Sequence, residues 1–133
     1  MKTLLLTVAL VALLVTTTSS ATRTQPAAQD LPAALAKTID DRNAADFAAL
    51  FTENGVFNDL GTVKRGRAAI AGFAQEIIDF QGKYVTRSVT VNGERVRWLS
   101  DFTGGGGSYR LRGQGDFQLE RGFIRTLEIA RQP

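Results

Sequence analysis

Two kinds of hydrophobic spacing divide this chain at about residue 82. Between residues 31 and 80, apolar side chains recur at intervals of three and four, which is typical of one face of a helix. After Gly82 they alternate with polar side chains, as they do in half-buried strands. This order predicts helices first and then an antiparallel meander of long strands. It indicates an α+β fold with the helices packed on one face of the sheet.

The first half of the pattern predicts three helices, at about 31–42, 43–51 and 67–80. Asn43 is the expected N-cap of the second helix, because its side chain can accept a backbone N–H of the first turn. The turn-forming residues Glu53-Asn54-Gly55 are expected to end that helix. A short strand over 56–60 then turns at Gly61 into a second extended segment, 62–64.

The second half predicts four strands, at 84–91, 95–103, 109–120 and 123–130. Asn92-Gly93 is a strong hairpin signal between the first two of them. In the strand 95–103, alternation places Val96, Trp98, Ser100 and Phe102 on one face. The run of glycines over 104–107 is expected to form a hairpin tip.

The first 21 residues are typical of a cleavable signal peptide. Lys2 supplies a positive charge, residues 4–15 are almost entirely apolar but too few to span a bilayer, and Ser19 and Ala21 fit a cleavage site after Ala21. We therefore expect a signal peptide at 1–21, a flexible tether at 22–30 and one domain at 31–133. The protein is expected to be secreted or periplasmic, and free of the membrane once the signal is removed.

Composition narrows the possible chemistry. The 133 residues include 44% hydrophobic and 22% charged residues, as in a globular protein, and the net charge of +3 is too small to suggest a nucleic-acid partner. There is no Cys and no His, which excludes disulfides, thiol nucleophiles, Ser-His-Asp triads and zinc sites with sulfur or imidazole ligands. Acid–base chemistry would have to use carboxylates, Tyr, Lys or water. We expect no metal and no cofactor.

Four stretches in this order resemble the SnoaL-like branch of the nuclear transport factor 2-like superfamily. They are residues 41–51 (DRNAADFAALF), 55–59 (GVFND), 66–70 (GRAAI) and 113–124 (GQGDFQLERGFI). The resemblance implies a cone-shaped roll, in which three N-terminal helices pack on a strongly curved, mainly antiparallel sheet. It also implies an apolar pocket at the open end of the cone and, often, a homodimer formed through the exposed face of the sheet.

The superfamily that these stretches resemble includes polyketide cyclases, ketosteroid isomerase, epoxide hydrolases and dehydratases, as well as non-enzymatic domains, so the fold alone does not choose the function. We expect a small, largely apolar organic ligand in the cone. One alternative is a cofactor-free enzyme of the lyase, isomerase or cyclase type. The other is a non-catalytic protein-association domain.

Asp59 is the first catalytic candidate. The segment Phe57-Asn58-Asp59 resembles the one that carries the general base of ketosteroid isomerase. A carboxyl at the mouth of an apolar pocket would lose solvation, which raises its pKa and suits it to move protons. The alternative is a solvated Asp in a turn. The two hydrogen-bond donors of the isomerase's oxyanion hole, a Tyr and a protonated Asp, are absent, because their positions fall on Leu35 and Gly115. Steroid isomerisation is therefore not expected.

Asp116 is the second catalytic candidate, because SnoaL-like cyclases carry an acidic residue in the matching strand. Here it stands one residue before Phe117, and strict alternation would turn it to the opposite face of the sheet. A bulge at Gly113 or Gly115 would bring it back. Without a bulge, Asp116 is expected to be an exposed residue paired with a neighbouring Arg.

Four aromatic residues are candidate ligand-binding walls of the pocket, namely Phe57, Phe73, Tyr84 and Trp98. The alternative for each is simple core packing. The predicted sheet is also rich in arginine. These side chains would bind an acidic ligand if they faced the pocket, and would otherwise form a solvated face or the rim of a dimer. They are Arg87, Arg95, Arg97, Arg110, Arg112, Arg121 and Arg125.

Overall fold

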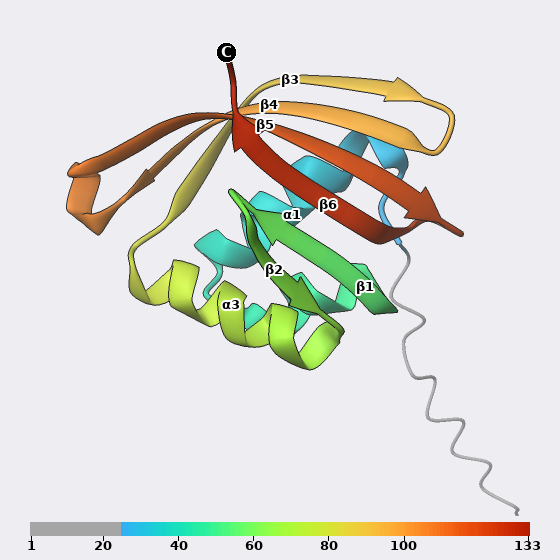
Figure 1. The fold of residues 1–133 in the computed structure, drawn as a ribbon, viewed down its shortest axis with the longest axis horizontal. Helices are drawn as coiled ribbons and strands as arrows, with labels where there is room; N and C mark the ends of the chain where they lie inside the picture. The colour runs from blue at the N-terminus through green and yellow to red at the C-terminus, as the bar shows by residue number, and fades with distance from the viewer. Residues whose placement is uncertain (1–24) are drawn as a thin grey trace, which may run out of the picture.

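The computed structural model describes residues 25–133, and it confirms the predicted order of helices and strands (Figure 1). The helices are η1 (Ala28–Asp30), α1 (Leu31–Asp40), α2 (Ala44–Ala49) and α3 (Arg67–Asp79). The strands are β1 (Phe51–Asp59), β2 (Thr62–Arg65), β3 (Lys83–Asn92), β4 (Arg95–Gly104), β5 (Tyr109–Glu120) and β6 (Phe123–Arg131). A short turn, η2 (Gly105–Gly107), joins β4 to β5.

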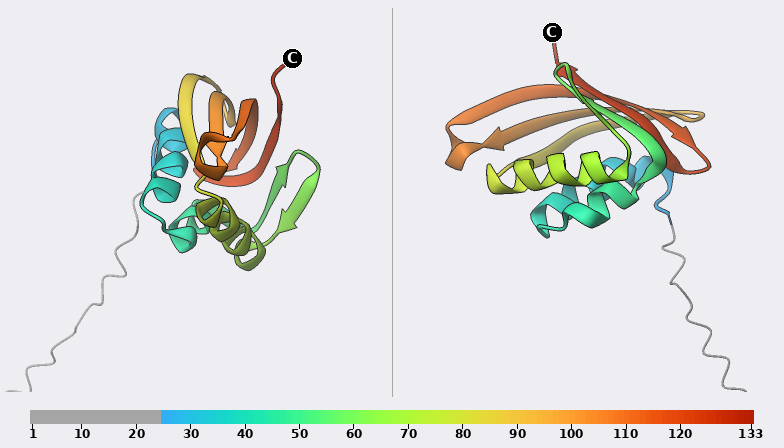
Figure 2. Two further views of the ribbon diagram at one scale, coloured as in Figure 1. Left: turned by 90° about the vertical axis from the view of Figure 1, so that its left-hand side faces the viewer. Right: turned by 60° about the horizontal axis from the view of Figure 1, so that its bottom comes forward.

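The strands form one mixed, mainly antiparallel sheet in the order β2-β1-β6-β5-β4-β3. Strands β1 and β6 run parallel, and each other neighbouring pair in this sheet is antiparallel. The long strands β3 to β6 arch over the three helices (Figure 2). The predicted class, an α+β roll of three helices on a strongly curved sheet, is therefore confirmed. The sheet is curved and not closed.

The core lies between the helices and the inner face of this arch. Burial alternates strictly along β5, where every second residue from Leu111 to Leu119 is buried. Strand β4 contributes Val96 and Trp98, as its alternation predicts. The helices contribute Leu35, Ile70 and other side chains that are almost completely buried. The apolar side chains that the helix and strand spacing predicts to be buried thus pack against one another in a single core.

The segment Glu53-Asn54-Gly55 corrects one prediction, because it lies inside strand β1 and does not end a helix. Phe51 pairs with Ile124 while Val56 pairs with Thr126, so the strand carries extra residues in a bulge. Gly55 is required there, since a Cβ at this position would lie 3.0 Å from both the Cβ of Phe51 and the carbonyl oxygen of Thr52. The turn-forming residues therefore mark a bend in the strand.

Arg67, the first residue of α3, holds this bulge in place. Its Nε and Nη2 donate to the carbonyl oxygen of Phe51 at 3.0 and 2.8 Å. The predicted cap of α2 is also present, with the N–H of Asp46 donating to the Asn43 Oδ1 at 2.9 Å. The hairpin between β3 and β4 forms one residue later than predicted, since Asn92 pairs with Arg95 around Gly93 and Glu94.

The predicted signal peptide (1–21) and the first part of the predicted tether lie outside the described residues, so their assignment stays a prediction. The rest of the tether, 25–30, is held against the fold. Gln25 Nε2 donates to the carbonyl oxygen of Leu50 at 3.2 Å, and residues 28–30 form the turn η1. Over residues 25–133, no helix has both the length and the hydropathy that a membrane span requires.

Candidate functional site

Asp59 is the last residue of β1 and stands directly before a tight turn. Leu60 and Gly61 form the turn with φ values of 52° and 93°, in the left-handed region. The N–H of Leu60 donates to the carbonyl oxygen of Ile129 at 3.0 Å, and the N–H of Gly61 donates to the Asn58 Oδ1 at 2.9 Å. These bonds hold the end of β1 against β6. Leu60 adopts a conformation that is costly for a branched side chain.

A cavity of about 40 Å³ lies beside Asp59 on the inner side of the sheet. It holds about three water-sized spheres at roughly 10–15 Å³ each. Its other walls come from the turn after β1 and from strands β3, β4, β5 and β6. They are Leu60, Tyr84, Ser100, Phe102, Tyr109, Leu111, Gly113 and Ile129. The lining is thus largely apolar, with one carboxyl and three hydroxyl groups.

The Asp59 carboxyl is partly withdrawn from water, and this burial raises its pKa. No ion pair joins it to any Lys or Arg among residues 25–133. The Tyr84 hydroxyl also has a raised pKa, mainly because the residue is buried and further because of the negative charge of Asp59. Tyr84 therefore keeps its proton at ordinary pH and remains a hydrogen-bond donor.

Three aromatic rings line the cavity and lie at steep angles to one another. The rings of Tyr84 and Phe102 are 4.8 Å apart with 50° between their planes. The rings of Phe102 and Tyr109 are 6.1 Å apart with 70° between their planes. The three rings therefore do not form a parallel stack.

Of the four predicted aromatic walls, Tyr84 lines this cavity and the other three lie in the core. Phe57 is completely buried, and its ring lies 5.8 Å from that of Phe47 and 5.4 Å from that of Phe73. Phe73 is partly buried against this core. The structure therefore gives Phe57 and Phe73 a packing role.

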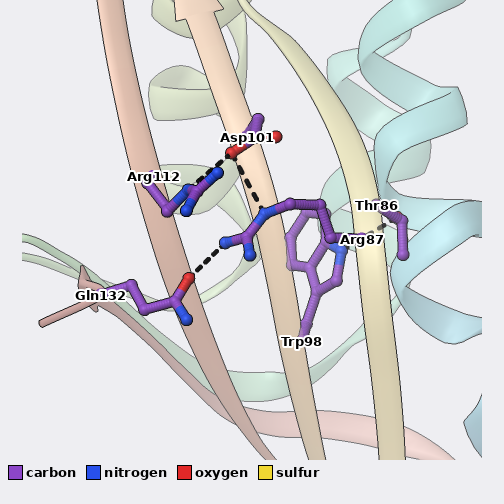
Figure 3. Close-up of polar contacts among 6 residues, drawn as sticks. All are labelled: Thr86, Arg87, Trp98, Asp101, Arg112 and Gln132. Carbon is purple, nitrogen blue, oxygen red and sulfur yellow. Dashed lines mark hydrogen bonds and ion pairs between the residues drawn. The ribbon is translucent and has the colours of Figure 1, made fainter.

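Trp98 fills the space above Gly115, where the isomerase comparison places an Asp. A Cβ on Gly115 would lie 3.3 Å from the Trp98 Cε3. The indole Nε1 donates to the Thr86 Oγ1 at 3.0 Å (Figure 3), which satisfies the one polar group of this completely buried side chain. The indole ring therefore packs against the position where the isomerase has its Asp.

Asp116 lies on the outer face of the sheet and is not brought together with Asp59. The pairing of β5 with β4 runs without interruption through Gly113 and Gly115, so the bulge that would have turned Asp116 inward does not form. The residue is exposed, and Arg97 Nε lies 3.0 Å from its Oδ1. This is the arrangement expected of a solvated cross-strand pair.

None of the arginines named above lines the cavity. Arg87 and Arg112 both approach Asp101 Oδ1, with their Nε atoms at 3.1 and 3.6 Å, and Arg87 also donates to Gln132 (Figure 3). An open hollow of about 640 Å³ on the outer face is lined by Arg97, Asp116 and other mostly polar residues. Because these charges are exposed and partly neutralise each other, this face matches the solvated surface expected as one alternative.

Seven of the nine cavity residues were not among the predicted site residues, and three of these seven carry a hydroxyl group or an aromatic ring, namely Ser100, Phe102 and Tyr109. Ser100 is buried, with 4% of its surface exposed. A polar residue on the apolar face of the strand 95–103 was a usable signal. Tyr109 begins β5 after the glycine-rich tip, and no local pattern marks it. Among residues 25–133, no three His, Cys, Asp or Glu side chains are grouped so that they could hold a metal ion.

The geometry defines a class of protein: an α+β cone with a small cavity and one desolvated carboxyl at the end of its first strand. Residues 33–126 match the model of the SnoaL-like domain family. Since this match covers more than half of the sequence, the chain belongs to the SnoaL-like domain family. Among curated proteins, none matches this sequence.

Solved structures share the fold at low sequence identity. An NTF2-like protein of unknown function from Cytophaga hutchinsonii is 22% identical with a TM-score of 0.70, over 84% of this chain and 95% of that one. A candidate polyketide cyclase from Sinorhizobium meliloti is 18% identical with a TM-score of 0.66, over 79% of this chain and 100% of that one. A candidate ketosteroid isomerase from Kribbella flavida is 21% identical with a TM-score of 0.66, over 80% of this chain and 81% of that one. These similarities concern the fold.

Proposed function

We propose that this protein binds a small, largely apolar organic molecule in the cavity beside Asp59. The observation that carries the proposal is the placement of one partly desolvated carboxyl in a lining that is otherwise largely apolar and aromatic, with three hydroxyl groups. Small-molecule sites are commonly of this kind, with an apolar wall and a few polar groups that orient the ligand. The cavity is small, so it would hold one end of a ligand while the rest lies at the mouth.

Two exposed apolar side chains, one in the lining of the cavity and one in contact with it, support this arrangement. Leu60 lines the cavity and still has 43% of its surface exposed. Phe80, at the end of α3, is 46% exposed, and its ring lies 6.0 Å from that of Tyr109 in an edge-to-face contact. A ligand whose polar end enters the cavity would cover these surfaces with its apolar part, and burial of apolar area favours binding.

A second candidate is a cofactor-free enzyme of the lyase, isomerase or cyclase type. The observation that favours it is that the hydroxyl-bearing residues Tyr84, Ser100 and Tyr109 line the same cavity as Asp59. A carboxyl with a raised pKa can take up and return a proton, and a neutral Tyr hydroxyl can donate to developing negative charge. Asp116 has no part in this proposal, because it lies on the other face of the sheet.

The test compares Asp59→Asn with Asp116→Asn in a screen of small enolisable ketones, epoxides and lactones. Binding is followed by backbone amide shifts of Ser100 and Gly113, and turnover is followed separately. Ligands that shift both amides would support the binding function. Turnover that is lost in Asp59→Asn and kept in Asp116→Asn would support the enzyme. A screen that leaves the cavity amides unmoved would contradict both and would favour a protein-association domain.

Homodimer formation and export remain predictions. Light scattering on the purified protein measures the first. Sequencing the N-terminus of protein recovered outside the cytoplasm measures the second, with Thr22 expected as the first residue.

A further inference from the structure

A purely apolar ligand would give the partly buried Asp59 carboxyl no partner for its negative charge. The side chain is partly buried, and no cation among residues 25–133 lies within ion-pair distance of it. The groups that line the cavity with it include no Lys, Arg or Glu, and the other titratable ones are Tyr84 and Tyr109. A desolvated carboxylate without a cation is unfavourable, and a positive charge within about 4–6 Å would favour its charged form.

The rest of the lining is suited to a particular kind of cation. Aromatic rings attract cations through the negative faces of their π-systems, most strongly when the cation has lost water. Tyr84, Phe102 and Tyr109 supply three such rings, which contact one another along the lining of the cavity. Leu60, Leu111 and Ile129 complete the wall with aliphatic groups. Aliphatic contacts suit methyl groups on nitrogen better than N–H groups, which would lose their hydrogen bonds to water.

We infer that the cavity takes a methylated organic ammonium ion, with the cationic head between the three rings and beside the Asp59 carboxylate. This inference rests on the proposed binding function and names the chemical class of its ligand. The apolar remainder of the molecule would lie over Leu60 and Phe80 at the mouth.

The experiment compares two probes of the same shape that differ in charge. Choline carries a trimethylammonium head, and 3,3-dimethyl-1-butanol carries a neutral tert-butyl group in its place. Their dissociation constants are measured by titration of the amide shifts of Ser100 and Gly113, in the wild-type protein and in Asp59→Asn. Asp116→Asn is the matched control, since it removes an exposed carboxylate on the outer face of the sheet.

We expect choline to bind at least about tenfold more tightly than the alcohol. Asp59→Asn should remove that advantage, so that the two probes bind with similar affinity, whereas Asp116→Asn should leave the advantage of choline as it is in the wild type. A second readout is the Asp59 carboxyl itself, whose pKa should fall when choline is added and stay constant with the alcohol.

Equal binding of the two probes would overturn the ammonium inference and leave the proposed binding function standing. Choline binding that is unchanged in Asp59→Asn would overturn it as well. If neither probe moves the cavity amides, the ammonium inference fails, and the proposed function then depends on the wider ligand screen described above.

Discussion

Two glycines on the inner face of β5 provide the sharpest test of where the cavity lies. Gly113 lines the cavity, and Gly115, two residues further along the same strand, lies under Trp98. Both are buried, and neither has a positive φ, so their backbones accept alanine without strain. The two substitutions therefore add the same methyl group to the same strand face, and only its surroundings differ.

At Gly113 the added methyl would meet its neighbours only at ordinary van der Waals distances. Its nearest contact is the Ser100 Oγ at 3.6 Å, an ordinary van der Waals distance. A Gly to Ala change at such a site stabilises by about 0.4–1 kcal/mol, because the unfolded chain loses freedom. In a domain of this size the melting temperature should rise by roughly 2–6 °C. The methyl takes the place of about one of the three water-sized spheres, and crowding of this kind should weaken choline binding by about 1–3 kcal/mol.

At Gly115 the methyl would lie 3.3 Å from Trp98 and 3.4 Å from Leu127, both completely buried. Crowding a packed core in this way costs about 1–3 kcal/mol. Thermal and urea unfolding of the two variants, measured side by side, should therefore shift in opposite directions. The reasoning is refuted if Gly113→Ala destabilises the fold as much as Gly115→Ala does, or if Gly113→Ala binds choline as the wild type does.

Three further outcomes are expected. Phe57→Leu should lower the free energy of unfolding in urea by about 1–2 kcal/mol and leave probe affinity within about twofold, and a selective loss of affinity would restore Phe57 as a ligand wall. Leu60→Asn should weaken probe binding but change stability by less than about 1 kcal/mol, since Asn tolerates the left-handed conformation, and a larger loss would assign Leu60 a core role. Asp59→Asn should unfold at higher temperature than the wild type at pH 7. Folding raises the pKa of this carboxyl above its ordinary 3.8 and so penalises its ionised form. The difference should shrink as the pH falls through the folded-state pKa and vanish well below 3.8, where the carboxyl is neutral in both states. A difference that stays constant with pH would contradict that assignment.

The alternation of the strands could be predicted from the sequence because the two-residue period is a local property of the backbone. It predicted the bounds of β5 correctly, and it placed Val96, Trp98 and Ser100 on one face. The same rule placed Asp116 on the opposite face from Phe117 unless a bulge intervened. The helix period and the Asn43 cap are equally local, and the order of the elements followed from them.

Other features depended on contacts between distant segments. The bulge at Gly55 needs the close approach of Phe51 and the hydrogen bonds from Arg67, so the turn-forming residues alone could not distinguish it from a helix end. The sequence identified Asp59 as a carboxyl at the end of a strand. Its desolvation depends on residues from other strands, such as Tyr84 and Tyr109.

The sequence by itself therefore determined the class of fold, the buried faces of β4 and β5, and the place of the Asp59 carboxyl at the end of a strand. Only the tertiary structure decided which aromatic side chains reach that carboxyl. Phe57, Phe73 and Trp98 are as apolar as the rings that line the cavity, but the arch of the sheet brings them together with the helices in the core. Hydrophobicity favours burial without direction, and the position of each ring is set by packing among segments that are far apart in the chain.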